Sequence, residues 1–261
     1  MICAGIDAGS RATKIVIFDS DSNEIIAQGL ADQGVEQDEI ANRLFDSLLD
    51  EKDIKKPGVQ KIVATGYGRD IISIADTTVT EITCQAVGVK FFSPDARTII
   101  DIGGQDSKVV RLDDKGRVRD FVMNDRCAAG TGRFLEIVAE RLGLDVELLG
   151  DIAVKSKAPA VISSMCVVFA ESEIIGLLAS GKAKEDIVAG VQRAIASRIA
   201  SMVGRTLDLP VIFTGGVALV SGMSRVLSDV IQQRVTVSLQ PQMTAALGAA
   251  IIAANERNGS V

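Results

Sequence analysis

The stretch GIDAGSRATK (residues 5–14) decides the fold, because it reads as the end of one strand, a glycine turn and the start of a second strand. A later stretch, DIGGQD (residues 101–106), has the same plan of an aspartate at a strand end followed by glycine. This self-similarity indicates an internal duplication. The surrounding patterns predict strands at 2–7, 14–19 and 24–31, and again at 97–102, 108–112 and 118–123.

Helical patterns follow these two strand-rich segments, which makes the fold class α/β. We expect one lobe over residues 1–95, a second lobe over 96–241, and a C-terminal segment 242–261 that packs back on the first. The pattern predicts helices at 37–51, 80–92, 132–142, 167–180, 184–207, 220–233 and 244–255, with further strands at 61–64, 211–214 and 235–238.

The glycine turns are candidate phosphate sites, because main-chain N–H groups can approach a phosphate closely only where side chains are absent. Such turns follow Asp7, Asp101 and Thr214. A single turn of this kind is usually an ordinary hairpin, but three of them favour a nucleotide. Asp7 and Asp101 are placed to hold Mg²⁺ through water, since that ion takes few protein oxygens beside the phosphates. No P-loop is present, and no G-x-G-x-x-G run opens a helix after the first strand.

The composition limits the possible partners. With 47% hydrophobic and 24% charged residues the chain has the makeup of a globular protein with a core. A net charge of -6 and the lack of any lysine or arginine run argue against nucleic acid and anionic membranes. No apolar run approaches the roughly 18 residues of a membrane span, and no basic leader precedes the first strand, so we expect a cytoplasmic protein. Histidine is absent, which leaves carboxylates, amides, lysine, hydroxyls, thiolates or a cofactor for chemistry.

The chain has four cysteines, and a reducing cytosol argues against structural disulfides between them. Cys3 and Cys84 fit the pattern of small buried hydrophobic residues. Cys127 and Cys166 each precede a predicted helix, and a helix N-terminus stabilises a thiolate. A cubane cluster takes four thiolates, which a two-fold dimer supplies from two chains. Zinc is the weaker alternative, because the chain has no C-x-x-C pair and no histidine.

Longer motifs resemble a known family. GIDAGSRATK, DIGGQD and FTGGVA (213–218) resemble the phosphate-1, phosphate-2 and adenosine motifs of the superfamily of actin, heat-shock chaperones and sugar kinases. Three further stretches resemble the ATP-dependent activators of 2-hydroxyacyl-CoA dehydratases, relatives of the ATPase subunits of benzoyl-CoA reductases. These are ATGYGR (64–69), MNDRCAAGTGRFLE (123–136) and SSMCVVFAESE (163–173). The resemblance spans nearly the whole chain and implies duplicated actin-like, ribonuclease H-like lobes with a nucleotide cleft between them.

The resemblance also implies roles for individual residues around ATP or ADP. Gln105 would orient the attacking water, since an amide cannot act as a base. Arg11 departs from the family, which has a hydroxyl residue there, and Lys14 has the alternative interpretation of a solvated strand charge. The residues implied to surround the nucleotide are Ser10, Arg11, Ala12, Thr13, Lys14, Gly104, Gln105, Gly215 and Gly216, with Glu136 and Gln242 at its border.

The implied function is an ATP-driven transfer of one low-potential electron to a dehydratase. The implied protein is a homodimer that holds one 4Fe-4S cluster through Cys127 and Cys166 of each chain, with a ferredoxin or flavodoxin as reductant. In this scheme the acyl-CoA binds to the partner. Two alternatives stay open, a small-molecule kinase of the same superfamily with Asp7 or Asp101 as base, and a nucleotide-sensing regulator without redox chemistry.

Overall fold

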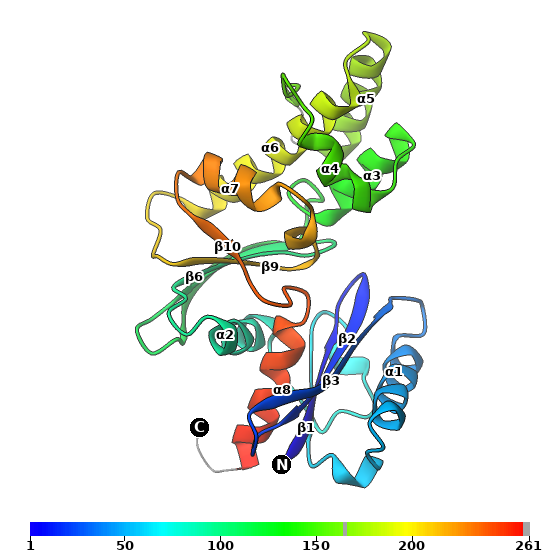
Figure 1. The fold of residues 1–261 in the computed structure, drawn as a ribbon, viewed down its shortest axis with the longest axis vertical. Coiled ribbons are helices and arrows are strands. Elements are labelled where there is room, and N and C mark those ends of the chain that lie inside the picture. The colour runs from blue at the N-terminus through cyan, green and yellow to red at the C-terminus, as the bar shows by residue number, and fades with distance from the viewer. Residues whose placement is uncertain (164–165, 258–261) are drawn as a thin grey trace. The chain divides into compact units, whose positions relative to one another are not determined.

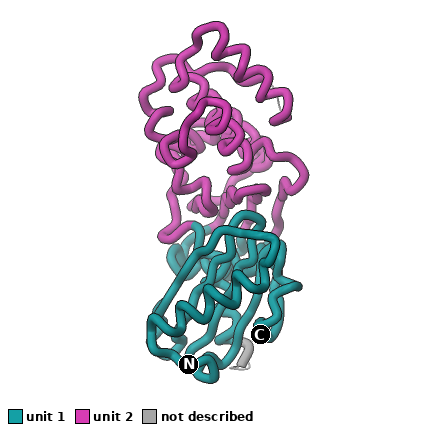
Figure 2. The backbone as a smooth tube through the Cα atoms, turned by 90° about the vertical axis from the view of Figure 1, so that its right-hand side faces the viewer, with its two compact units in different colours: residues 1–96, 112–119, 242–261 teal, residues 97–111, 120–241 magenta. Residues whose placement is uncertain are grey.

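The computed structural model describes residues 1–163 and 166–257, and these form two compact units (Figure 2). Unit 1 consists of Met1–Ala96, Leu112–Arg119 and the chain from Gln242 onward. Unit 2 consists of Arg97–Arg111 and Asp120–Pro241. No helix in the described ranges is long and apolar enough to cross a membrane. Each unit is built on its own five-stranded sheet.

The sheet of unit 1 has the strand order β3-β2-β1-β4-β5. The central strand β1 runs antiparallel to β2 and parallel to β4. The predicted strands at 2–7, 14–19, 24–31 and 61–64 are confirmed to within two residues, whereas the two-residue β5 was not predicted. The bounds are β1 Ile2–Ala8, β2 Ala12–Asp19, β3 Glu24–Asp32, β4 Ile62–Thr65 and β5 Thr77–Thr78.

Helices cover both faces of this sheet, as its strand sequences require (Figure 1). Side chains alternate along a strand, so Ala4 and Ile6 of β1 pack with Phe45 of α1 (Gln37–Glu51) on one face. Cys3 packs on the other face with α2 (Glu81–Phe92) and α8 (Thr244–Arg257). Apolar packing on both faces therefore fixes the position of the β1 carboxyl end.

The sheet of unit 2 repeats this plan with the order β10-β9-β6-β7-β8. Its central strand β6 runs antiparallel to β7 and parallel to β9, as β1 does to β2 and β4. The two units thus share one strand topology, which confirms the predicted duplication. The bounds are β6 Thr98–Ile102, β7 Ser107–Leu112, β8 Val118–Asn124, β9 Val211–Thr214 and β10 Val235–Val237.

The helices of unit 2 pack on Ile100, Ile102 and Val109 of this sheet. Two predicted helices were too long. The helix expected to reach residue 207 ends at Val203, because Gly204 takes a positive φ of 73°. The helix expected over 220–233 is shorter because Gly222 and Gln232, both at positive φ, bound it. The bounds are α3 Gly132–Leu142, α4 Leu149–Ala153, α5 Val167–Ala179, α6 Lys184–Val203 and α7 Met223–Ile231, of which α4 was not predicted.

The contact between α2 and α8 in unit 1 depends on two helical glycines. A Cβ on Gly248 would overlap the carbonyl oxygen of Cys84, and one on Gly88 would overlap that of Thr244. Glycine in a helix interior normally costs about 1 kcal/mol relative to alanine. Here glycine allows the backbones of α2 and α8 to approach closely. Replacing it with alanine should therefore lower the free energy of unfolding instead of raising it.

We expect Gly248→Ala to destabilise the protein by about 1–3 kcal/mol, the usual cost of overpacking a core. Gly176→Ala is the matched control, because Gly176 lies in α5 and a Cβ added there would have no neighbouring atom within 4 Å. The free energy of unfolding of this control should rise by up to about 1 kcal/mol. Urea unfolding of both variants measures the difference, and equal stabilities would show that α2 and α8 are not held this closely.

Candidate nucleotide and metal sites

The carboxyl end of β1 carries a buried ion pair and a buried carboxylate oxygen without a partner among the described residues. Asp7 is 5% exposed, and its Oδ2 lies 3.0 Å from Nζ of Lys14 on the adjacent strand. The second carboxylate oxygen, Oδ1, is buried and has no hydrogen-bond partner among the described residues. A Cβ on Gly66, which follows β4 at a φ of 89°, would overlap that oxygen. The absent side chain of Gly66 therefore lets the backbone after β4 pack closely against a carboxylate oxygen that lacks a partner among the described residues.

The turn after β1 packs just as closely against the lysine. A Cβ on Gly9 would lie 2.8 Å from Nζ of Lys14 and 2.9 Å from the carbonyl oxygen of Ala12. The turn closes through a hydrogen bond from the Gly9 amide to that carbonyl, at 3.1 Å. Gly9 and Gly66 together keep side chains away from the Asp7–Lys14 pair. This geometry suits an oxygen-rich ligand with its own charge.

The carboxyl end of β6 in unit 2 repeats the arrangement with more contacts. Oδ1 of Asp101 accepts a hydrogen bond from the Thr214 hydroxyl at 3.0 Å. Nζ of Lys108, which is 1% exposed, lies 3.5 Å from Oδ2 of Asp101 and 2.6 Å from Oδ2 of Asp106. Gly215, at a φ of 87°, would place a Cβ 2.8 Å from Oδ1 of Asp101. The lysine is buried because two carboxylates surround it.

The two units therefore share a set of four positions that sequence reasoning found only in part. An Asp is the next-to-last residue of the central strand, a Lys lies seven residues later on the antiparallel neighbour, and a Thr ends the parallel neighbour and is followed by Gly. Lys108, Thr65 and Gly66 were not proposed as site residues. The signals that could have found them are the repeated Asp-to-Lys spacing and the repeated Thr-Gly pair in ATGYGR and FTGGVA.

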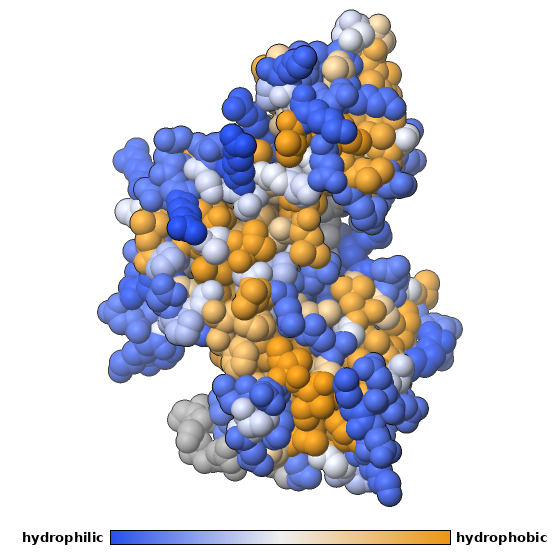
Figure 3. Space-filling model, viewed as in Figure 1, coloured by the Kyte–Doolittle hydropathy of each residue, from blue (hydrophilic) through white to orange (hydrophobic). Residues whose placement is uncertain are grey.

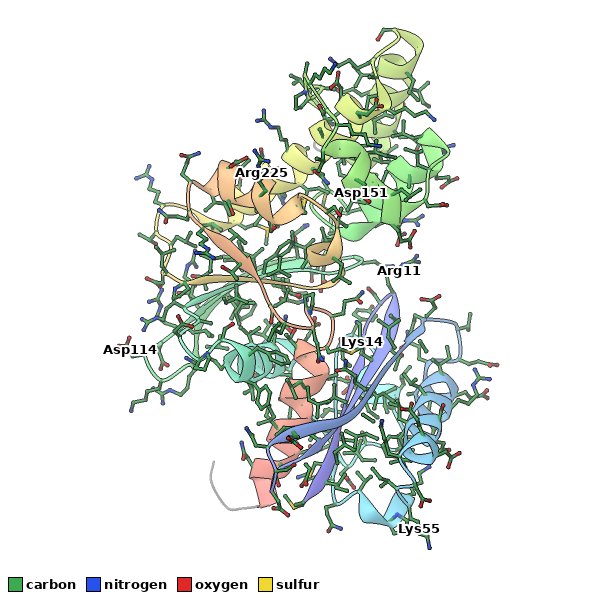
Figure 4. All side chains as sticks on the ribbon, viewed as in Figure 1. Arg11, Lys14, Lys55, Asp114, Asp151 and Arg225 are labelled. Carbon is green, nitrogen blue, oxygen red and sulfur yellow. The ribbon has the colours of Figure 1, made fainter. Side chains whose placement is uncertain are left out.

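The other residues of the first glycine turn differ in exposure. Figure 4 shows Arg11 at the tip of the β1–β2 hairpin, where it is exposed, and Lys14 further along β2. Ser10 and Ala12 are half-buried, and the buried Thr13 donates its hydroxyl to Oε1 of Gln33 at 2.8 Å. Because Lys14 is paired with Asp7, its interpretation as a solvated strand charge is wrong.

The remaining predicted nucleotide residues lie in both units. Gln105 is exposed in the β6–β7 turn, which the Gly103 amide closes by donating to the carbonyl of Asp106 at 3.0 Å. The Gly215 amide donates to the carbonyl of Pro241 at 2.9 Å, and Gly216 opens a short 3-10 helix. Gly104 and Glu136 also lie in unit 2, and Glu136 forms an ion pair with Arg133 at 2.9 Å. Gln242 lies in unit 1, where it is half-buried.

The four cysteines fall into two classes of environment. Cys3 and Cys84 are fully buried, which confirms their prediction as small core residues. Burial raises the pKa of the Cys84 thiol to about 12, so this thiol stays protonated and is a poor metal ligand. Cys127 is half-buried and Cys166 is exposed, and both lie in unit 2 as free thiols.

The two accessible cysteines differ in their position relative to a helix. Cys166 is the N-cap residue of α5, as the sequence predicted. Helix α3 begins at Gly132 as predicted, but its N-cap is Thr131, so Cys127 lies four residues before the N-cap and does not gain the expected stabilisation of its thiolate by the helix N-terminus. Cys127 instead lies in a loop whose carbonyls are bound by Asn124, with Nδ2 at 2.8 Å from the oxygen of Cys127.

Hydrogen bonds to two carboxylates hold the segment that precedes Cys166. Glu173 of α5 accepts from the amide and hydroxyl of Ser163, at 2.9 Å and 2.8 Å. Asp186 of α6 accepts from the Ala158 amide at 3.0 Å and the Ser156 hydroxyl at 2.7 Å, and these bonds lower its pKa to about 2. Ser164 and Met165, which belong to the predicted cysteine motif, lie outside the described residues.

A cluster or metal bound at these cysteines would need ligands from outside the chain. The described residues contain no group of three or more Cys, Asp or Glu side chains that could hold a metal ion. Cys127 and Cys166 supply two soft sulfur donors with access to solvent. This donor set suits iron-sulfur chemistry completed by a second pair of thiolates.

Comparison with known proteins identifies the family. The model of the BadF/BadG/BcrA/BcrD ATPase family matches residues 4–253. The chain belongs to this ATPase family. It is 43% identical to the 2-hydroxyisocaproyl-CoA dehydratase activator of Clostridioides difficile, over 100% of this chain and 97% of that protein. It is 41% identical to the (R)-2-hydroxyglutaryl-CoA dehydratase activating ATPase of Acidaminococcus fermentans, over 95% of both chains.

Solved structures agree with this family membership. The structure of the Clostridium difficile activator with bound ADPNP has a TM-score of 0.93 at 42% identity, covering 99% of this chain and 96% of that one. A hexokinase of the ROK family from Thermus thermophilus matches with a TM-score of 0.58 at 14% identity, covering 98% of this chain and all of the other. The second likeness shows the fold alone, and it confirms the actin-like ATPase fold class.

The buried lysine of this ATPase family member gives a direct test of the site in unit 2. Lys108→Met should destabilise the protein by about 3–5 kcal/mol, because Asp101 and Asp106 lose the cation between them. Lys155→Met, at an exposed position in the same unit, is the control and should change stability by less than about 0.5 kcal/mol. Denaturant unfolding at neutral pH measures both, and a Lys108→Met protein as stable as the control would contradict the ion-pair assignment.

Proposed function

We propose that the chain is an ATP-hydrolysing, homodimeric iron-sulfur protein that delivers single low-potential electrons to a 2-hydroxyacyl-CoA dehydratase. The observation that carries this proposal is the division of the cysteines, two sealed in the core of unit 1 and two accessible in unit 2. The named dehydratase activators that match nearly the whole chain support it. In this proposal a reduced ferredoxin or flavodoxin is the electron donor.

The strand-end carboxylates would handle the nucleotide with Mg²⁺. Asp7 keeps one buried oxygen without a partner among the described residues, which suits a water ligand of that ion. Lys14 lies 3.0 Å from the other oxygen and offsets its charge. Asp101 has the same position in unit 2, and Gln105 is the exposed amide of the adjoining turn. We assign Gln105 to orienting the water that attacks the terminal phosphate.

The glycine turns would bind the phosphates and the adenosine. In this proposal the turns that contain Gly9 and Gly104 approach the phosphates, and Ser10 to Lys14 continue the first turn. Gly215 and Gly216 would take the adenosine. We place Glu136 and Gln242 at the border of the nucleotide.

The thiolates of Cys127 and Cys166 would bind one 4Fe-4S cluster together with the same pair from a second chain. Such a cluster, when bound, supplies a one-electron carrier of low potential. The N-cap position of Cys166 favours its thiolate form. Val168 and Phe169, each 69% exposed, follow Cys166 on α5 and give that surface an apolar character that suits a second chain (Figure 3).

The cysteine assignment predicts which variants lose iron. Protein purified without oxygen should be brown and contain about two irons and two sulfides per chain, which is one cluster per dimer. Cys127→Ala and Cys166→Ala should each lose the visible absorbance and most of the iron. Cys3→Ala is the control and should keep both, because that thiol is sealed in the core. Wild-type protein that is colourless and free of iron would refute the proposal.

The assignment of Gln105 predicts a separation of ATP binding from hydrolysis. Gln105→Ala should slow hydrolysis about 10²-fold, since the attacking water is no longer positioned. Its affinity for a non-hydrolysable ATP analogue should stay within about twofold of wild type. Gln28→Ala, at an exposed position on β3, is the control for both measurements. Phosphate release and calorimetry give the two numbers, and unchanged hydrolysis would remove Gln105 from the site.

A further inference from the structure

The first turn of α3 is capped by another part of unit 2 rather than by its own N-cap side chain. The first amides of a helix have no partner within the helix. Here the Gly132 amide donates to the carbonyl of Gly103 at 2.9 Å, and the Arg133 amide donates to that of Gly104 at 2.8 Å. The N-cap residue Thr131 makes no side-chain cap. The turn that carries the predicted phosphate-2 motif is therefore bonded directly to α3.

Glycine at position 132 permits this close contact. A Cβ there would lie 3.2 Å from the carbonyl oxygen of Gly103 and 3.3 Å from Cα of Gly104. Both atoms belong to the backbone of the turn, so a side chain at position 132 would push the turn and the helix apart by a few tenths of an ångström. The two hydrogen bonds would lengthen as a result.

The loop between β8 and α3 is a rigid frame around Cys127. Asn124, which is 7% exposed, donates from Nδ2 to the carbonyls of Cys127 at 2.8 Å and Ala129 at 3.2 Å. Thr131 donates both its amide and its hydroxyl to the carbonyl of Ala128, at 3.1 Å and 2.7 Å. Because buried and repeated hydrogen bonds leave the loop little freedom, a shift of the α3 N-terminus also moves Cys127.

The segment before Cys166 is held by different elements. Its described hydrogen bonds join Ser163 to Glu173 of α5, and Ala158 and Ala160 to Asp186 of α6. The two cysteine-bearing regions meet at an ion pair between Arg141 and Glu171 and in the core of unit 2, where Phe134 of α3 and Ala170 of α5 belong to one buried apolar cluster. What differs between the two regions is the set of hydrogen bonds that holds each segment, from the β6–β7 turn and Asn124 on one side and from Glu173 and Asp186 on the other.

We propose that the carbonyls of Gly103 and Gly104 transmit nucleotide occupancy of the β6–β7 turn to Cys127, whereas Cys166 stays fixed to α5 and α6. The inference rests on the proposed function, since it assigns the regulation of the same site. Gly132 is the positioning residue of this link. One cysteine of each chain then responds to nucleotide and the other serves as a fixed support.

Hydrogen exchange of the intact, anaerobically purified protein with and without Mg²⁺ and ADPNP tests the link. In wild type, nucleotide should slow exchange about tenfold in peptides covering 101–108 and 124–136, with less than a twofold change over 156–163. In Gly132→Ala the turn at 101–108 should keep its response, and the response over 124–136 should be lost. Gly176→Ala, where an added Cβ has no neighbour within 4 Å, should behave as wild type.

A second variant covers the case in which Gly132→Ala does not fold. Asn124→Ala removes both donors to the Cys127 loop and should weaken the nucleotide response of residues 125–131 while sparing that of 101–108. Equal responses over 124–136 and 156–163 in wild type would overturn the inference, as would an undiminished response over 124–136 in Gly132→Ala. Iron analysis of the same samples separates the two proposals. Missing iron contradicts the proposed function, whereas iron present with an unresponsive 124–136 segment contradicts only the link.

Discussion

The buried charge at the end of each central strand is the constraint on which the rest of the structure depends. Asp7 and Asp101 are nearly inaccessible to water, and a carboxylate in such a place needs a cation or hydrogen-bond donors. Lys14 and Lys108 provide the cation, and each reaches its partner only because the antiparallel register places Asp and Lys directly opposite. A one-residue slip of β2 or β7 would turn the lysine to the other face of the sheet and leave the acid unpaired.

The two strand ends differ in the contacts that their carboxylates make. In unit 1 the carboxylate has a lysine on one oxygen, and its other oxygen is buried without a partner among the described residues. In unit 2 the carboxylate is bound by Thr214 and Lys108, and that lysine also binds Asp106. The strand end of unit 2 thus has more polar contacts than its counterpart in unit 1, although the two share one strand topology.

Local patterns predicted most of the fold, and non-local contacts explain what they missed. Strand ends and glycine turns are local, so the duplication and the positions of Asp7 and Asp101 could be found in the sequence alone. The partner of Lys108 depends on strand register, which local patterns do not show. The start of α3 at Gly132 was predicted, but its cap by the carbonyl of Gly103, far back in the chain, was not. Four loop residues separate Cys127 from α3, so the expected effect of a helix N-terminus on this thiol does not apply.

The glycines show why residue type alone could not distinguish site positions from core positions. Gly88 and Gly248 have no side chain so that two helices can touch, and their role ends with packing. Gly66 and Gly215 have no side chain for the same steric reason, but the atom they make room for is a carboxylate oxygen at a strand end. What distinguishes the second pair is a positive φ together with a charged neighbour, and both properties come from the tertiary structure. Gly132 combines the two roles, because its missing side chain lets a helix touch the backbone of the turn that we propose to bind nucleotide.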